Sequence, residues 1–319
     1  MLSTIRQIAA VILIALQMSL VVTLENGFYN RHMGLLAVLI MALLLSWFLL
    51  SGLTRLSDVG GFRSRVSKLS VPLIFAFMLL LVWQSLVCGF DVPLVLLPAP
   101  TLIVTAAWHN LPLLWADFQQ TYLKAVVAGY LIGCGSGFLV ARLAVRSQFL
   151  QNGLLPFGNF MSSIPIVGIA PVMVMWFGFD WPSKAAVVVI MTFFPMLINT
   201  VAGLQSVDPL HADLMRTYAA KKSQIFFKNQ LPQAMPFIFN ALKLNSTLAL
   251  IGAIVAEFFG TPIVGMGFRI STEVGRMNMD MVWATILVAA LAGSASYGAL
   301  SLLERMITFW HPSIRGVKH

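Results

Sequence analysis

Long apolar stretches, separated by short polar segments, recur along the whole chain. A membrane-spanning helix needs about 20 predominantly apolar residues to cross the hydrocarbon layer of a bilayer. Eight stretches approach this length, and they lie near residues 7–24, 34–52, 71–90, 121–141, 164–179, 184–205, 236–256 and 281–303. The pattern therefore predicts an all-α membrane protein with about eight transmembrane helices.

The positive charges between these stretches indicate how the helices are oriented. If the N-terminus is placed in the cytoplasm, 14 Lys and Arg residues fall on the inner side, 5 fall on the outer side, and Lys243 lies within a helix. Lys and Arg in short loops favour the cytoplasmic side of a membrane. We therefore expect both termini to be cytoplasmic.

Composition excludes an ordinary soluble domain. Of the 319 residues, 59% are hydrophobic and 10% are charged, whereas soluble domains carry about 25% charged residues. The net charge is +9, but the cations are spread over short loops and do not form the clustered basic face that binds nucleic acid. We therefore expect membrane lipid, and no nucleic acid, among the partners.

The basic loop 53–69 divides the chain into two parts. Residues 1–69 hold two N-terminal helices together with this loop, and residues 70–319 hold the other six. The first apolar stretch follows Arg6 and could be a signal peptide, but no small-residue cleavage site follows it. We therefore expect this stretch to be retained as a transmembrane helix.

Two outer segments carry polar or amphipathic features. Within residues 91–120, the stretch Leu102–Phe118 could lie along the membrane interface. Glu257 sits at an outer helix end, where it could pair with Arg269 or Arg276 or could contact the transported solute. We favour a structural role for this carboxylate.

The longest inner loop, residues 206–235, has a helical pattern. Asp208 can cap a helix that has Pro209 at its first position. At helical spacing, one face of this helix carries apolar side chains, namely Leu210, Leu214 and Tyr218, with Met215 beside them. The loop is therefore expected to begin with an amphipathic helix.

A second short helix is expected to run through Ile225 and Phe226 and to end before Pro232, because proline disfavours helix at the preceding residue. The residue pattern of the loop is compatible with two roles. The helices could lie on the lipid surface, with Lys221, Lys222 and Lys228 touching anionic headgroups. They could equally insert into a partner protein.

The stretch from Leu204 to Pro236 resembles the cytoplasmic coupling segment of binding-protein-dependent ABC importer permeases. That family's pattern is E-A-A, three residues, Gly, about a dozen residues and Leu-Pro. Alignment on Leu231-Pro232 places the glycine at Ala219 and the E-A-A at Asp213-Leu214-Met215. The acid is retained as Asp, whereas the two alanines and the glycine are replaced.

Three further stretches resemble the same family, and specifically its nitrate/sulfonate/taurine/pyrimidine-precursor branch. Residues 163–178 are similar to a proline-rich helix that ends in W-F-G. Residues 193–209 resemble the helix that leads into the coupling loop. Residues 254–260, followed by Gly265 and Gly267, resemble a V-A-E-x-x-G…G-x-G outer loop. The resemblance covers about residues 70–310.

The resemblance implies a six-helix type I ABC importer permease core with two extra N-terminal helices, in a bacterial inner membrane. Such a permease moves a small organic solute, delivered by a periplasmic solute-binding protein, by alternating access. It works with a second permease copy or a close paralogue. Its coupling helices dock on a dimer of ABC ATPase subunits, which hold the ATP and Mg. No cofactor is therefore expected on this chain itself.

The resemblance also implies roles for particular residues. Contact with the ATPase would fall to Asp213, Leu214, Met215, Tyr218 and Ala219. The solute pathway would involve the stretches 164–179 and 184–205, where the candidates are Ser162, Ser163, Met173, Trp176, Asn199 and Thr200. Ordinary helix packing would also account for each pathway candidate.

Enzymatic chemistry has no recognisable motif in this chain. The sequence contains no Gly-x-x-x-x-Gly-Lys-[Ser/Thr], no H-E-x-x-H, no G-x-S-x-G and no metal-spaced His/Cys set. We therefore expect a transport subunit that is not itself an enzyme and holds no metal. A secondary transporter or channel that is not coupled to ATP is the alternative, but the scarcity of membrane carboxylates argues against ion coupling.

The apolar stretches also bear on the solute. Members of this branch take nitrate, sulfonates, taurine or neutral heterocycles. A pathway for anions should present cations, yet the stretches 164–179 and 184–205 carry no Lys or Arg away from their ends. The pattern therefore favours an organic solute, such as a heterocycle, over nitrate.

Overall fold

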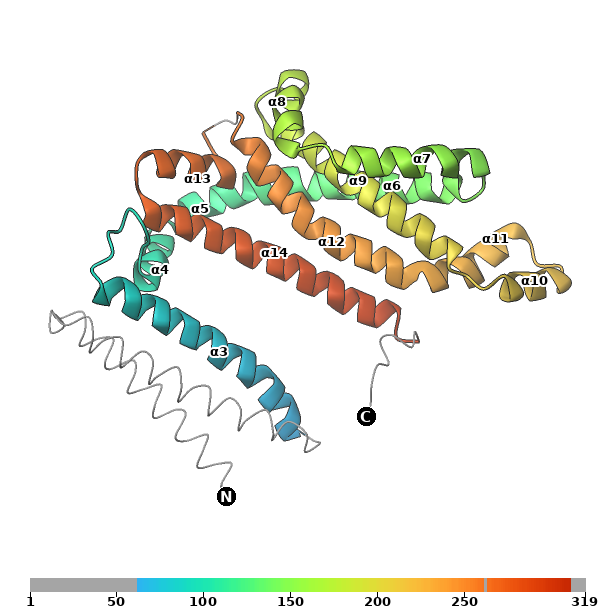
Figure 1. Ribbon diagram of the computed structural model, residues 1–319, viewed down its shortest axis with the longest axis horizontal. Coiled ribbons are helices and arrows are strands. Elements are labelled where there is room, and N and C mark those ends of the chain that lie inside the picture. The colour runs from blue at the N-terminus through green and yellow to red at the C-terminus, as the bar shows by residue number, and fades with distance from the viewer. Residues whose placement is uncertain (1–61, 261–262, 311–319) are drawn as a thin grey trace. The chain divides into compact units, whose positions relative to one another are not determined.

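The computed structural model describes residues 62–260 and 263–310, and the regular elements in this part of the chain are all helices (Figure 1). The predicted N-terminal helices near 7–24 and 34–52 lie outside the described residues. The elements are α3 (Phe62–Gly89), α4 (Pro100–His109), α5 (Leu111–Phe118), η1 (Gln119–Val126), α6 (Val127–Ala144), α7 (Gln148–Ser162), α8 (Ile166–Phe177), α9 (Trp181–Gln205), α10 (Pro209–Thr217), α11 (Lys222–Ile225), η2 (Phe226–Gln230), α12 (Leu231–Glu257), α13 (Met266–Gly275) and α14 (Met279–Ile307). The two η segments are π-helical.

Four continuous helical stretches in the described part of the chain are long and apolar enough to cross a membrane. They are Leu111–Ala144, Trp181–Gln205, Lys222–Glu257 and Met279–Ile307. The bent pair of α7 and α8 makes a fifth if it is counted as one span, and α3 ends in a shorter apolar stretch, Phe75–Gly89. The all-helical membrane class is therefore confirmed, while the count of eight spans stays a prediction.

The helix predicted near 164–179 is present as α8, but it is shorter than expected and follows a sharp bend. α7 and α8 meet at 98°, and α8 has 12 residues, which at about 1.5 Å per residue is too short to cross a bilayer. The cause is Pro165, which holds an extended conformation with ψ 124° and has no N–H to donate. The stretch 164–179 therefore holds one short helix, which forms a bent pair with α7 before it.

The stretch Leu102–Phe118, expected along the membrane interface, is divided between two elements. α4 ends at His109, whereas α5 begins at Leu111 and continues through η1 into α6 as one helix of 34 residues. Pro112 lies in the first turn of α5, where its missing N–H costs no hydrogen bond. The second half of the stretch therefore belongs to a membrane-crossing helix.

The second helix of the inner loop does not end before Pro232, so that expectation is wrong. α11, η2 and α12 form one helix of 36 residues. In η2 the Leu231 N–H donates to the Phe226 carbonyl, five residues back, and this shifts the hydrogen-bond register just before the proline. Pro232 then falls in the first turn of α12, where a proline is tolerated.

The described chain forms two compact units. The first holds α3, α4 and the first turns of α14, and the second holds α5 to α13 with the rest of α14. In the first unit, Gln84 joins α3 to α4 through Thr101, because its amide donates to the hydroxyl (3.0 Å) and its carbonyl accepts from the Thr101 N–H (3.2 Å). The Trp83 ring also meets Trp283 edge-on, 5.1 Å away.

The core of the second unit is built from α6, α9 and α12, which run side by side, with α10 and α11 at one end and α13 at the other (Figure 1). Gly129, Gly133 and Gly137 line the face of α6 that meets α9. A Cβ atom on Gly133 would lie 2.9 Å from the Val189 carbonyl oxygen, whereas one on Gly135 would meet nothing within 4 Å. Small residues on this face let the two backbones approach closely.

Local hydrogen bonds define both ends of α10. The predicted cap at Asp208 is confirmed, since its carboxylate accepts from the Leu210 N–H at 2.9 Å. At the other end the Ala220 N–H donates to the Met215 carbonyl, and the Ala219 N–H donates to the Arg216 carbonyl. This pair of bonds is a Schellman motif, which places Ala219 in the left-handed region with φ +56°. The family's glycine aligns with this residue.

We expect Ala219→Gly to stabilise the end of α10. An L-residue in the left-handed region costs about 1–2 kcal/mol, and glycine removes this cost. Amide hydrogen exchange in the last turn of α10 should therefore slow by about fivefold or more. Ala220→Gly, outside the left-handed position, is the matched control and should speed exchange. Equal rates for Ala219→Gly and the parent chain would contradict this account of the helix end.

Candidate functional site

The α10 end of the core presents an apolar face that stays exposed among the described residues. The side chains of Leu210, Leu214 and Tyr218 are 75%, 57% and 81% exposed. They follow one side of α10, as the sequence pattern predicts. An isolated helix of nine residues is not stable by itself, so its attachment to the core must hold it in place.

The segment from Asp208 to Gln233, called the coupling segment below, is attached to the core through η2. Phe226 is buried in a cluster with Cys134, Leu204 and Ile238. The side chain of Gln233 donates to Asn229 at 2.5 Å and reaches His211 of α10 at 3.5 Å. Packing of Phe226 therefore anchors the coupling segment in the core, and the Gln233 bonds join its two ends.

Arg142, in the last turn of α6, also contacts this segment. Its guanidinium carbon lies 4.5 Å from the centre of the Phe226 ring and 5.5 Å from that of Phe227. Nearby, the Gln151 amide donates to the Val145 carbonyl (3.2 Å) and accepts from Gln205 (2.7 Å). Arg142 therefore joins the end of α6 to the coupling segment, and Gln151 of α7 joins the ends of α6 and α9.

A buried polar network lies at the opposite end of the core, around the start of α13. The Asp117 carboxylate accepts from Arg269 Nε at 2.8 Å and from the Gly265 N–H at 2.8 Å. Next to it, Thr121 donates to the Glu257 carboxylate at 2.7 Å and accepts from the Met266 N–H at 2.7 Å. The network ties the start of α13 to α5 and η1.

Glu257 therefore has other partners than Arg269 and Arg276, the two that the sequence suggested. Its carboxylate also accepts from the Gly267 N–H, at 2.6 Å, in the first turn of α13. Arg269 pairs with Asp117, and Arg276 pairs with Glu273 at 3.3 Å. Backbone donors at the start of a helix favour a carboxylate, so the role of Glu257 is structural, as we expected, but with other partners.

The Lys184 side chain joins the ends of two helices in this region. It is 1% exposed, and its ammonium donates to the Ser183 hydroxyl (3.2 Å) and to the carbonyls of Phe179 (2.6 Å) and Gly260. These carbonyls follow α8 and α12, whose C-terminal ends carry partial negative charge. The buried cation therefore bridges both ends to the start of α9.

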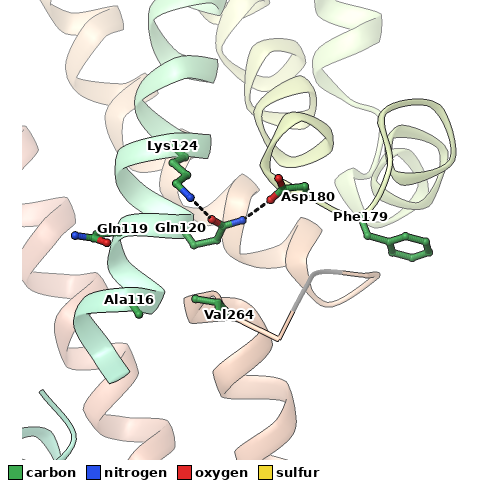
Figure 2. A pocket seen from close by; sticks show the side chains of 7 residues that line it. All are labelled: Ala116, Gln119, Gln120, Lys124, Phe179, Asp180 and Val264. Atoms are coloured by element: carbon green, nitrogen blue, oxygen red, sulfur yellow. Dashed lines mark hydrogen bonds between the residues drawn. The ribbon is translucent and has the colours of Figure 1, made fainter. Parts of the chain in front are cut away.

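Beside Lys184 the surface is hollowed by an open cavity of about 720 Å³ (Figure 2). Gln120 crosses one side of this cavity, accepting from Lys124 at 3.0 Å and donating to Asp180 at 2.6 Å. The Trp181 backbone N–H, followed by the Gln120 amide, holds the pKa of Asp180 below its usual value. The remaining lining comes from Ala116, Gln119, Phe179 and Val264.

The pathway candidates are spread over several environments. Met173 and Thr200 are buried, whereas Trp176 is 71% exposed. The Asn199 amide donates to the Pro195 carbonyl at 2.8 Å, and the exposed Ser163 hydroxyl donates to the Phe160 carbonyl at 2.6 Å. The side chain of Ser162 lies outside the described part of the chain. Their role in a pathway stays a prediction.

Sequence reasoning missed the residues that organise both ends. Asp117 and Arg269 lie 152 positions apart, so no local pattern joins them. Lys184 and Arg142 were visible only as charges at the ends of apolar stretches. A charged side chain that is buried inside a membrane protein needs partners there. This rule was the one signal in the sequence that pointed to Lys184 and Arg142.

Known proteins are similar to this chain in sequence over most of its length. The profile of the family described as "Binding-protein-dependent transport system inner membrane component" matches residues 125–309. The formylaminopyrimidine transport permease protein ThiX of Halalkalibacterium halodurans is 29% identical over 75% of this chain and 95% of its own. The riboflavin transport system permease protein RibX of Chloroflexus aurantiacus is 29% identical over 82% of this chain and 97% of its own.

An aliphatic sulfonates transport permease protein, SsuC of Bacillus subtilis, is 30% identical over 76% of this chain and 88% of its own. The matched regions include α6, α9 and α12, together with the coupling segment between them. The chain therefore belongs to the family of binding-protein-dependent transport system inner membrane components, as an ABC importer permease of the nitrate/sulfonate/taurine branch.

Proposed function

We propose that this chain is the permease subunit of an ATP-driven importer in a bacterial inner membrane. A periplasmic binding protein delivers a small organic solute to its α13 end, and alternating access carries the solute across the membrane. The observation that carries the proposal is the exposed apolar face of α10, held at the point where α9 ends and the helix into α12 begins.

The chemistry of this face supports a protein partner over a lipid surface. Arg216, the basic residue in the last turn of α10, is paired with Asp213 at 2.8 Å, and the exposed Lys221, Lys222 and Lys228 lie beyond the end of α10, outside its apolar face. Lipid-surface helices instead present several free cations to anionic headgroups. An apolar face with one paired acid suits insertion into a groove of an ATPase subunit. Asp213, Leu214, Met215, Tyr218 and Ala219 form the proposed contact.

The rest of the assembly follows from this contact. A dimer of ATPase subunits, holding ATP and Mg, docks on the coupling segments of two permease copies. Both termini then lie in the cytoplasm, on the α10 side of the membrane, in agreement with the excess of Lys and Arg in the inner loops. The solute path runs between the copies, and α8 and α9 contribute the pathway candidates.

The charges within the helices support an organic, heterocyclic solute. Two basic residues occur in α8, α9 and α12, namely Lys184 and Lys243. Lys184 is bound by protein oxygens, and Lys243 pairs with Glu304 at 2.7 Å in a largely buried contact. Neither cation is therefore available to bind an anion in transit. The names of two relatives, for formylaminopyrimidine and riboflavin transport, point the same way.

We expect Leu214→Asp to weaken the ATPase contact. A charge at the centre of an apolar docking face, buried without a partner, costs several kcal/mol, which is about a hundredfold or more in affinity. Co-purification of the ATPase subunit with the permease in detergent measures the change. Ser223→Asp, an exposed residue of the same loop outside the face, is the matched control and should retain the subunit. Retention of the ATPase by Leu214→Asp would count against the proposed docking face.

We expect uptake of labelled heterocycles to exceed uptake of nitrate. The two basic residues of α8, α9 and α12 are both paired, so an anion entering the membrane would lose its hydration without a compensating charge. A panel of labelled pyrimidine, flavin, sulfonate and nitrate solutes, each supplied with the importer's own binding protein, measures the preference. Strong uptake of nitrate alone would contradict the preference for an organic solute.

A further inference from the structure

Arg142 joins the last turn of α6 to the start of η2, beside the buried cluster that Phe226 shares with Cys134 of α6. It lies in the last turn of α6, and its guanidinium stands over the rings of Phe226 and Phe227 at 4.5 Å and 5.5 Å. Guanidinium groups are attracted to aromatic faces at such distances and stack on them through their planar shape. Phe226 is 7% exposed, so the ring beneath the guanidinium is fixed by its neighbours.

The coupling segment reaches the three core helices in different ways. It follows directly from α9, and it runs without a break into α12. α6 has no such covalent route, because α7, α8 and α9 separate it from the segment along the chain. The segment is therefore joined to α9 and α12 through the backbone, whereas its direct contact with the last turn of α6 is made by side chains.

The backbone of η2 also differs from that of an ordinary helix. Its π-helical turn joins the Leu231 N–H to the Phe226 carbonyl, five residues back. Such turns interrupt the regular register and recur at functional positions. The residue that accepts this bond, Phe226, is the same residue on which Arg142 stacks. The contact therefore sits at the irregular turn between α11 and α12.

We infer that Arg142 is a positioning residue that transmits movement of the coupling segment to α6, so that ATP hydrolysis and solute movement stay linked. The inference rests on the proposed function. Without the stacked guanidinium, the ATPase still docks on α10 and still hydrolyses ATP, but the last turn of α6 no longer follows η2 closely. The consequence is uncoupling, which a residue needed only for folding would not produce.

A simpler role for Arg142 is electrostatic. A cation in the last turn of a helix stabilises the negative end of the helix dipole, and a cation near the membrane surface attracts anionic lipid. Lysine would serve both of these purposes equally well. It lacks the planar group that stacks on two rings, so Arg142→Lys separates the two roles.

The test uses the complete importer in proteoliposomes, with the binding protein, the ATPase subunits and the solute that the unmodified importer takes up. ATP hydrolysis and labelled uptake are measured together, and their ratio is the readout. Arg142→Lys and Arg142→Gln should each lower uptake per ATP by about tenfold, while hydrolysis continues. Phe227→Leu, at a half-exposed position that tolerates change, should lower the ratio in the same direction. Arg146→Gln, an exposed cation just beyond α6, is the control and should leave the ratio unchanged.

The outcomes separate this inference from the proposed function. A normal ratio for Arg142→Lys and Phe227→Leu would overturn it. A lower yield of assembled importer with an unchanged ratio for Arg142→Gln would also overturn it, because Arg142 would then act in folding alone. If the unmodified importer shows no ATP-dependent uptake, the proposed function fails, and the inference fails with it.

Discussion

The whole structure depends on one constraint, which is that a broken backbone hydrogen bond inside a membrane must be replaced from within the protein. Pro195 has no N–H to donate to the Met191 carbonyl in α9, and beside this site the Asn245 amide of α12 donates to the Thr192 carbonyl at 2.8 Å. Just beyond the ends of α8 and α12, the carbonyls of Phe179 and Gly260 accept hydrogen bonds from the Lys184 ammonium. Side-chain donors thus bind backbone carbonyls at these irregularities, and they join α9 to α12 and to the end of α8.

The two ends of this core differ in a way that fits a transporter. At the α13 end, the Asp117–Arg269 pair and the Glu257 carboxylate hold the outer loop with buried charge-assisted hydrogen bonds. At the α10 end, apolar side chains stand exposed on a helix that is capped but not covered. A firmly bonded end and an exposed end suit a protein that is driven from one side and opens on the other.

Much of the coupling segment could be predicted from sequence, because its signals are local. The Asp208 cap and the apolar face of α10 are confirmed, and the alignment of the family's glycine with Ala219 agrees with its left-handed backbone. The continuation through Pro232 was not predictable, since it depends on a π-helical shift in the preceding turn. The partners of Asp117 and Glu257 were not predictable either, because they lie far away along the chain.

The central claim, that ATP hydrolysis by a docked partner drives import, is tested most directly by the energy dependence of uptake. The importer is reconstituted in proteoliposomes with its ATPase and binding protein, and solute uptake is followed with ATP, with a non-hydrolysable analogue, and with an ion gradient in place of nucleotide. The account predicts uptake with ATP alone. Uptake that persists without ATP, or that follows the ion gradient, would contradict it and would favour a secondary transporter or channel.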